Sequence, residues 1–452
     1  MTVTYDPKHP RYYDDDDLQG ELTRVFDLCH GCRLCFNLCP SFPSLFDAID
    51  GHDGDVEALS RAERNQVVHE CYQCKLCYVK CPYVPPHDWR LDFPRLMLRA
   101  TASAKHGRPR PLADQVLGHT DLLGRLNTAM APVVNAITAR PGTPVRKVMD
   151  KTLGIASERL LPPYARQRFS TWFRKRRPSL GRPRQAEVAL FPTCFVEYNR
   201  PDIGHDLVKV YEHNGVACEL PDGLGCCGAP WLHAGDFDRF EAAARKNLPI
   251  LAQAIRRGHD VVVPQPTCGY VLRRDYPDYL GGPDAELLAT HVLDSSEFLM
   301  RLHRDPACEL STDFAGDVPE AITYHVPCHL QAQNIGLKSR DVMKLTGARI
   351  TLVNKCSGID GTWGLRAENY AEARRVARPL VEGIGRAGNV VVAGDCSLAN
   401  GAIEEETGIA AVHPLQLLAR AYGLAPEPGA GRSPSRAAAP SPLPPPPGGG
   451  RA

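Results

Sequence analysis

The carboxyl-terminal half of the chain alternates short apolar runs with amphipathic stretches. Four of the apolar runs are rich in β-branched residues and end in a cysteine: AEVALFPTC (Cys194), DVVVPQPTC (Cys268), AITYHVPC (Cys328) and NVVVAGDC (Cys396). Between them, segments such as IGHDLVKVYEHNG and KSRDVMKLTGA have helical spacing. Strands that alternate with helices predict βαβ units and a parallel sheet. Residues 186–425 are therefore predicted to form an α/β region.

This α/β region contains an internal repeat. Three cysteine positions in the first half are separated by 32 and 42 residues, and three in the second half by 28 and 40. They are Cys194, Cys226 and Cys268, then Cys328, Cys356 and Cys396. The loop GCCGAPW, with Cys226 and Cys227, corresponds to CSGIDGTWG, with Cys356 and Ser357. Ligands of open parallel sheets collect beyond the carboxyl ends of the strands. We expect two modules, residues 186–315 and 316–425, each with its cysteines at one edge of a sheet.

Two tighter cysteine clusters lie in residues 21–100. They read CHGCRLCFNLCP and CYQCKLCYVKCP, both C-x2-C-x2-C-x3-C-P, which is the spacing of paired [4Fe–4S] sites whose fourth cysteine ligates the other cluster. Three thiolates within seven residues can wrap one corner of a cubane, so the fourth comes from elsewhere. The predicted ligands are Cys29, Cys32, Cys35 and Cys81 for the first cubane, and Cys71, Cys74, Cys77 and Cys39 for the second. Structural zinc is the alternative, but it normally uses two C-x2–4-C pairs.

The polypeptide between these clusters predicts the type of domain. The 31 residues that separate Cys39 from Cys71 lack Gly/Pro-rich hairpins and are helix-prone. A compact β-rich ferredoxin has hairpins at this point. We therefore expect an α-helical ferredoxin-type domain over residues 21–100.

Composition narrows the cellular setting. The chain has 452 residues, 17 cysteines and a net charge of +1, which gives no argument for a nucleic-acid partner. Residues 1–20 form an acidic segment without a signal-peptide core, expected to be a flexible arm, and no run approaches the ~20 apolar residues of a membrane span. A cytoplasmic location follows, where disulfides are rare and clustered cysteines indicate metal or redox chemistry. Residues 426–452 are Pro, Gly, Ala and Ser and are predicted to be a disordered tail.

A basic, cysteine-free connecting region is predicted over residues 101–185. Within 140–184 there are 13 Lys or Arg against Asp150 and Glu158. Apolar residues interleave with these cations over 145–177, and Trp172 and Phe173 precede the basic end. Such a segment suits the anionic inner face of a membrane, and it equally suits docking of a partner subunit or covering of the core.

The two modules differ in their donor sets. In the first module Cys194, Cys226, Cys227 and Cys268 are predicted to hold a third cluster, with Gly225 and Gly228 supplying the φ > 0 conformations that turn both loop cysteines inward. A redox-active Cys226–Cys227 pair is the alternative. The second module keeps Cys328, Cys356 and Cys396, which predicts a degenerate fourth cluster site. Its fourth ligand would be His325, His329, Asp360 or an exogenous group; in the alternative, the histidines only bond the loop and the cysteines only pack.

These motifs resemble a known family. TCFVEYNRPDIGHDLVKV, GCCGAPW, PTCGYVLRRDYPDYL, PCHLQ, CSGIDGTWGLRAENY and GDCSLANGAIEEETG are similar to heterodisulfide reductase-related iron–sulfur proteins with CCG domains. The chain most resembles the C subunits of anaerobic glycerol-3-phosphate dehydrogenases, over about residues 21–425. CSG and DC-x-L-A in place of CCG and C-x2-C resemble a sub-branch associated with rubrerythrin-type peroxide reductases. The resemblance implies electron transfer through iron–sulfur clusters and raises the expectation of membrane association.

The sequence therefore predicts an iron–sulfur electron-transfer subunit of an oxidoreductase rather than a stand-alone enzyme. Its expected partner is a flavoprotein dehydrogenase subunit, a quinone or a rubrerythrin-like peroxidase. Two alternatives stay open at this point. The first is a disulfide or heterodisulfide reductase acting at the CCG site, and the second is a zinc-stabilised scaffold.

Overall fold

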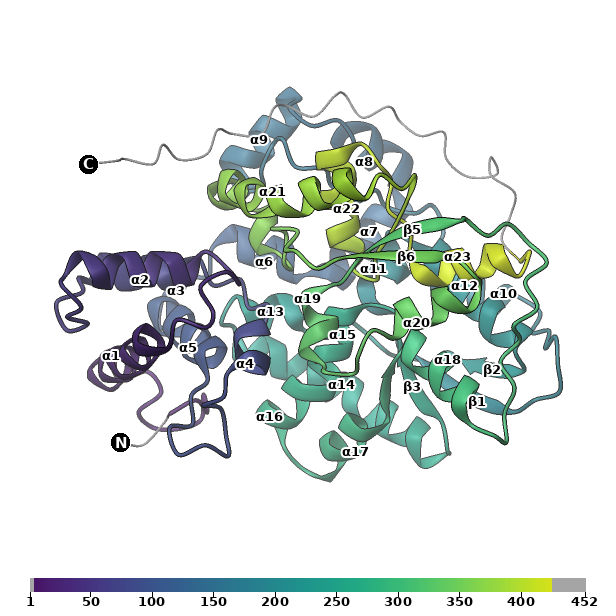
Figure 1. Cartoon of the computed structure of the whole chain (residues 1–452), viewed down its shortest axis with the longest axis horizontal. Coiled ribbons are helices and arrows are strands. Elements are labelled where there is room, and N and C mark those ends of the chain that lie inside the picture. The colour runs from purple at the N-terminus through teal and green to yellow at the C-terminus, as the bar shows by residue number, and fades with distance from the viewer. Residues whose placement is uncertain (1–3, 425–452) are drawn as a thin grey trace. The chain divides into compact units, whose positions relative to one another are not determined.

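The computed structural model describes residues 4–424, which divide into two compact units (Figure 1). The first unit contains the chain up to Gly118 together with Gly228–Glu241, and the second contains His119–Cys227 and the chain from Ala242 onward. The sequence did not predict the return of 228–241 to the first unit. The expected boundary at residue 100 falls within a helix, and the predicted disordered tail lies outside the described residues.

The described part of the first unit is built from helices. They are α1 (Asp15–Cys32), α2 (Ser41–Gly51), α3 (Arg61–His69), α4 (Leu76–Lys80), α5 (Phe93–Lys105), α6 (Leu112–Gly118) and α13 (Ala229–His233). The helix α3 begins at a capping box, in which the Ser60 hydroxyl accepts the Glu63 N–H and the Glu63 carboxylate accepts the Ser60 N–H. The prediction of a helical ferredoxin-type domain is confirmed.

Aromatic side chains form the core of this unit. Phe26 of α1, Phe42 and Phe46 of α2 and Phe93 of α5 are all buried, and the Phe42 and Phe93 rings stack with centroids 4.6 Å apart. Cysteines from both N-terminal clusters pack against the same core. The cluster loops are therefore anchored on one hydrophobic centre.

The amino-terminal segment is ordered where it is described, contrary to the expectation of a flexible arm over 1–20. The acidic run is the start of α1: the Asp14 side chain accepts the Asp17 N–H, and carboxylates favour a helix N-terminus. Tyr12 is buried, and the fully buried Arg99 guanidinium donates to the carbonyl oxygens of Tyr12 and Arg11, both at 2.7 Å. The negative charges that suggested solvation instead serve a helix terminus and a buried cation.

Two parallel sheets organise the second unit, as the alternating pattern predicts. The strands of the first sheet, in spatial order, are β2 (Val216–Glu219), β1 (Ala186–Leu190), β3 (Asp260–Val263) and β4 (Val292–Asp294). Those of the second sheet are β6 (Arg349–Val353), β5 (Ala321–His325) and β7 (Val391–Ala393). In each sheet the first strand of the repeat lies between the second and third, so the two modules share one topology.

Helices cover these sheets. Before β1 lie α7 (Thr120–Ala129), α8 (Ala131–Thr138), α9 (Pro144–Leu153) and α10 (Phe169–Lys175). The first module has α11 (Thr193–Tyr198), α12 (Pro201–His213), α14 (Phe237–Arg256), α15 (Pro266–Tyr270), the π-helical η1 (Val271–Asp275), α16 (Tyr276–Leu280), α17 (Pro283–His291) and α18 (Ser295–Arg304). The second has α19 (Cys328–Ala332), α20 (Lys338–Leu345), η2 (Trp363–Leu365), η3 (Ala367–Asn369), α21 (Tyr370–Ala387), α22 (Ser397–Thr407) and α23 (Pro414–Ala421). Val188 and Val262 of the first module share one core with Val342 and Leu415 of the second.

The basic connecting region is helical, and its aromatic end lies against the protein. Trp172 and Phe173 of α10 pack on the core of the second unit, and the Trp172 ring lies 4.0 Å from that of His205. These aromatic residues therefore do not form the exposed amphipathic face suggested by the sequence of 145–177. None of the helices within residues 4–424 is long and apolar enough to span a membrane.

Candidate metal centres

The first cysteine triplet lies at the end of α1. Cys29 and Cys32 occupy its last turns, and Arg33 ends the helix in the left-handed conformation (φ 52°), which redirects the chain toward Cys35. Burial raises the pKa of the Cys29 thiol, and the neighbouring Cys35, Cys81 and Cys32 raise it further. The structure therefore brings Cys81, from the second motif, to the first triplet.

The second triplet surrounds a small pocket with the remaining cysteine of the first motif. Cys39, Cys71, Cys74 and Cys77 all line this pocket, together with Phe42, Phe93 and other core residues. Gln73 and Lys75, which alternate with the cysteines, both have left-handed backbones (φ 63° and 64°) that coil the loop around the pocket. Non-glycine residues rarely adopt this conformation, so two in one loop indicate that a specific cysteine arrangement is being held.

The two triplets differ in local charge. At the second, Lys75 is only 4% exposed, and its ammonium donates to Gln73 Oε1 at 2.7 Å. The Gln73 amide in turn donates to the Cys71 sulfur at 3.5 Å. At the first triplet the equivalent residue is Arg33, which lies at the surface in an ion pair with Asp50. The second site therefore has a buried cation that the first lacks.

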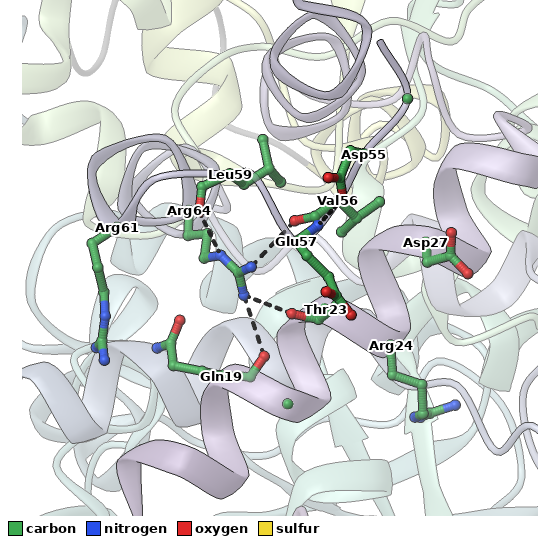
Figure 2. Close-up of a pocket in the computed structure, with 12 residues that line it drawn as sticks. Gln19, Thr23, Arg24, Asp27, Asp55, Val56, Glu57, Leu59, Arg61 and Arg64 are labelled. Carbon is green, nitrogen blue, oxygen red and sulfur yellow. Dashed lines mark hydrogen bonds between the residues drawn. The ribbon is translucent and has the colours of Figure 1, made fainter. Parts of the chain in front are cut away.

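A polar pocket elsewhere in the first unit fixes the loop between the two motifs. It has a volume of about 890 Å³, and its lining includes no cysteine. Figure 2 shows the Arg64 guanidinium bridging this loop to α1. It donates to the carbonyls of Leu59 and Val56, both at 3.2 Å, to Thr23 Oγ1 at 2.8 Å and to the Gln19 carbonyl at 3.3 Å. These bonds give Arg64 a structural role in holding the inter-motif loop.

In the first α/β module, four cysteines follow three adjacent strands. Cys194 lies on α11 after β1, Cys226 and Cys227 lie in the loop after β2, and Cys268 lies on α15 after β3. The Cys227 and Cys268 sulfurs are 3.3 Å apart. The Cys226 thiol hydrogen-bonds with those of Cys194 and Cys227. All four thiols thus form one connected group and not only the vicinal Cys226–Cys227 pair.

The cysteines sit slightly beyond their strands and not on them. Each strand ends three to five residues before its cysteine, which lies at the start of the following helix. Before Cys194, Thr193 has φ 67°, a rare conformation for a β-branched residue, and its Oγ1 accepts the Val196 N–H at 3.4 Å. This strained turn directs Cys194 toward Cys226.

Two buried side chains clamp the Cys226–Cys227 loop. Asn247 Oδ1 accepts the Gly225 N–H at 2.8 Å, and its Nδ2 donates to the Cys226 carbonyl at 2.9 Å and to the Tyr276 hydroxyl at 3.2 Å. The Tyr276 hydroxyl donates to the Cys227 carbonyl at 3.1 Å. The sequence carried no signal for either residue, because both come from helices outside every cysteine motif.

A third residue missed by sequence reasoning is Asp121 of α7. Its Oδ2 accepts the Cys226 N–H at 2.8 Å, and its Oδ1 accepts the Tyr198 hydroxyl at 3.3 Å. Asp121 also explains Gly225. Only Gly228 has the expected positive φ (90°); Gly225 does not, and a Cβ there would lie 2.7 Å from Asp121 Oδ2. Glycine is needed at 225 for close approach and not for backbone conformation.

The second module places three cysteines at the carboxyl edge of one sheet. Cys328 begins α19 after β5, Cys356 follows β6 and accepts the Gly358 N–H at 3.3 Å, and Cys396 caps α22 after β7. Burial raises the pKa of Cys396 to about 11, although the N–H groups of residues 398 and 399 act in the opposite direction. N–H···S bonds of this kind tune the potential of a ligated cluster.

The three candidate fourth ligands are in different environments. Asp360 lies close enough to Cys396 to raise the pKa of its thiol, and its Oδ1 is 3.6 Å from His329 Nδ1. The His329 ring also contacts Thr267 Oγ1 at 3.1 Å, which joins the two modules beside Cys268. His325 is buried with Nε2 on the Lys355 carbonyl at 3.1 Å, and burial lowers its pKa to about 4.

The donor sets suit a multinuclear cluster. Within residues 4–424, no three His, Cys, Asp or Glu side chains are placed to hold a single metal ion. The structure instead arranges thiols around a pocket in the first unit and as a linked group of four in the first module. Soft thiolate sulfur is the donor that iron–sulfur clusters use.

Comparisons with known proteins define the class. A 4Fe-4S dicluster domain model matches residues 21–82, and a cysteine-rich (CCG) domain model matches residues 188–273 and again 322–400. The chain is thus an iron–sulfur protein with one dicluster domain followed by two cysteine-rich domains. The dicluster match also argues against zinc at the N-terminal motifs.

Individual relatives make the family specific. The C subunit of anaerobic glycerol-3-phosphate dehydrogenase from Escherichia coli (strain K12) is 32% identical over 405 residues, 88% of this chain and 98% of the relative. The B subunit of fumarate reductase (CoM/CoB) from Methanothermobacter marburgensis is 32% identical over 167 residues, 36% of this chain and 30% of the relative. Lactate utilization protein A of Exiguobacterium sp. is 27% identical over 190 residues, 40% and 74% of the two chains. The chain belongs to the family of anaerobic glycerol-3-phosphate dehydrogenase C subunits and is an iron–sulfur electron-transfer protein, which confirms the resemblance.

Proposed function

We propose that the chain relays electrons between a partner oxidoreductase and an acceptor through two [4Fe–4S] clusters in the first unit and a third cluster in the first α/β module. Iron–sulfur clusters accept and donate single electrons, and the chain's own residues ligate them, exclude water and set their potentials. The observation that carries the proposal is the exchange of fourth cysteines between the N-terminal motifs. Cys81 lies with the first triplet and Cys39 with the second.

The proposed ligands of the third cluster are Cys194, Cys226, Cys227 and Cys268. Their support is the linked group of thiols and the side chains that hold the loop from outside it. Asn247, Tyr276 and Asp121 bond the backbone of the loop, so the thiols remain available for ligation.

We further propose a degenerate fourth site in the second module, with Cys328, Cys356 and Cys396 as ligands and Asp360 as the fourth. Asp360 is favoured over His325 because it adjoins Cys396, whereas His325 Nε2 bonds the Lys355 carbonyl. Contact between His329 and Thr267 connects the surroundings of the two module sites, since these residues adjoin Cys328 and Cys268. This proximity suits electron exchange between the modules.

The proposed electron donor is a flavoprotein dehydrogenase subunit that oxidises an organic substrate, by analogy with the Escherichia coli relative, which is named as one subunit of such an enzyme. A quinone or a rubrerythrin-like peroxidase is the proposed acceptor. Reoxidation of the anaerobically reduced protein tests the choice. Rapid reoxidation by a short-chain quinone supports the first, and reoxidation only with a rubrerythrin and peroxide supports the second.

Peripheral attachment to an anionic membrane is the proposed localisation, through a surface of α7–α9. Leu122, Leu126, Met130, Val133 and Ile137 are 44–57% exposed and recur every three or four residues. Val145 and Val148 of α9 add two more exposed apolar side chains. The exposed charged residues of 122–152 are all cations, namely Arg125, Arg140, Lys147 and Lys151. An apolar stripe flanked by cations complements anionic lipid headgroups.

Vesicle co-sedimentation tests this surface. The protein should bind vesicles containing anionic lipid at low salt and bind them less at high salt, because the cations are screened. Leu126→Gln should weaken binding several-fold. Leu112→Gln is the matched control, since Leu112 is as exposed (54%) but lies on α6 of the first unit. Equal binding by the two variants would contradict the assignment of the surface.

Iron and sulfide quantitation on anaerobically purified protein tests the relay itself. About eight irons per chain correspond to two cubanes, and about twelve to a third cluster. EPR of the reduced wild type, Cys194→Ser and Cys356→Ser assigns the signals of the two modules. A zinc-dominated protein without visible absorption would overturn the proposal.

A further inference from the structure

A cavity of about 240 Å³ opens beside Cys194 in the second unit. Its walls come from α7, from the chain at 168–174, from the start of α11 and from the loop after β2. Of the four cysteines of the first module, Cys194 is the one among the lining residues. The cavity therefore reaches the candidate third cluster site from the side of the basic connecting region.

Three arginines from different segments line this cavity: Arg125 of α7, Arg168 before α10, and Arg174 of α10. Arg174 pairs with Asp222, but both side chains are largely exposed, and such pairs are weak. Within residues 4–424, the Arg168 side chain has no hydrogen bond or ion pair. A cation without a counter-charge therefore lines a concave site.

The two acids of the lining are already engaged. Glu197 accepts the Ser170 N–H at 2.9 Å and its hydroxyl at 2.6 Å. Asp121 accepts the Cys226 N–H and the Tyr198 hydroxyl. Both carboxylates thus bond to groups of the protein and leave the Arg168 guanidinium without a partner. A guanidinium in this situation favours an oxyanion, which it can bind through two parallel hydrogen bonds.

The size and remaining lining narrow the ligand further. A volume of 240 Å³ corresponds to about eight water molecules at ~30 Å³ each, which admits a small metabolite but not a nucleotide. Pro192, Leu220 and Leu224 supply apolar wall. A fitting molecule has one oxyanion group and a short uncharged part.

We propose that this cavity binds a small phosphate- or carboxylate-bearing molecule, with Arg168 as its principal anchor and Arg125 and Arg174 as supporting cations. The bound molecule would lie against Cys194. The site adds small-molecule recognition to a chain otherwise described as a relay between proteins. It does not depend on electron transfer, so it stands or falls separately from the relay.

Calorimetric titration of the full-length, cluster-loaded protein with inorganic phosphate and, separately, with succinate tests the proposal at constant ionic strength in chloride buffer. One saturable site is expected for at least one of these anions. Arg168→Gln should weaken binding at least tenfold, as expected for loss of a charge-assisted bidentate pair. Arg166→Gln is the matched control, because Arg166 is exposed and absent from the lining.

The outcomes separate cleanly. Saturable binding that Arg168→Gln weakens and Arg166→Gln leaves unchanged supports the site, and the preferred anion assigns the phosphate or carboxylate class. Absence of saturable binding of both anions overturns it, as does equal affinity in wild type and Arg168→Gln. If Arg168→Gln does not fold, Arg125→Gln replaces it, since Arg125 is exposed on α7 and its loss should weaken binding by a smaller factor.

Discussion

Replacing Asn247 with leucine is predicted to empty the first-module site while sparing the N-terminal clusters. Asn247 is fully buried, and its amide makes close hydrogen bonds to the Gly225 N–H, the Cys226 carbonyl and the Tyr276 hydroxyl. Leucine has nearly the same shape but can make none of these bonds. The substitution therefore removes the clamp on the cysteine loop with little change in volume.

The magnitude follows from the groups left without partners. The Gly225 N–H and the Cys226 carbonyl lose theirs, whereas the Tyr276 hydroxyl keeps the Cys227 carbonyl at 3.1 Å. A buried backbone group without a partner costs about 1–3 kcal/mol. Gly225 is partly exposed and can regain water, so the free energy of unfolding should fall by about 2–4 kcal/mol.

The assay combines anaerobic urea denaturation with iron quantitation. Asn247→Leu should lower the unfolding midpoint and remove about four irons, while the EPR signals of the two N-terminal cubanes persist. The matched control is Asn389→Leu. Asn389 is also partly buried, but it donates only to the hydroxyls of Thr323 and Thr351, at 3.1 and 3.4 Å, so a loss below about 1 kcal/mol is expected. Wild-type iron content and midpoint in Asn247→Leu would refute the reasoning.

Further predictions address charge, pH and the second module. Lys75→Gln should lower the potential of the second N-terminal cubane by on the order of 100 mV, because a buried cation stabilises the reduced cluster, whereas Arg33→Gln at the surface should have little effect; equal shifts in a redox titration would contradict this. Burial lowers the pKa of His205 to about 4, so its contribution to stability is lost as pH falls from about 6.5 to 4; the unfolding midpoint of His205→Gln should therefore change less than that of wild type between pH 7.5 and 5. Cys356→Ser should reduce iron and alter the EPR spectrum, and unchanged values would leave the second module without a cluster.

Local spacing was sufficient for the cysteine motifs. Three thiols within seven residues can meet only at one corner of a cluster, so C-x2-C-x2-C-x3-C-P directs its last cysteine to the other motif; the structure places Cys81 and Cys39 accordingly. The alternation of apolar runs and helices likewise predicted both parallel sheets. In a parallel sheet all carboxyl ends share one edge, and this brings together cysteines that are distant in sequence.

Tertiary structure decided what surrounds these cysteines. Asp121 is 105 residues from Cys226, and Tyr276 is 49 from Cys227, so no local pattern could connect them. The basic segment shows the same limit in a different way. Its alternation of apolar and charged residues was visible, but Trp172 and Phe173 face the core, while the exposed apolar surface lies on α7–α9. Periodicity shows that a helix has an apolar face, and only packing against neighbouring elements determines whether that face is covered.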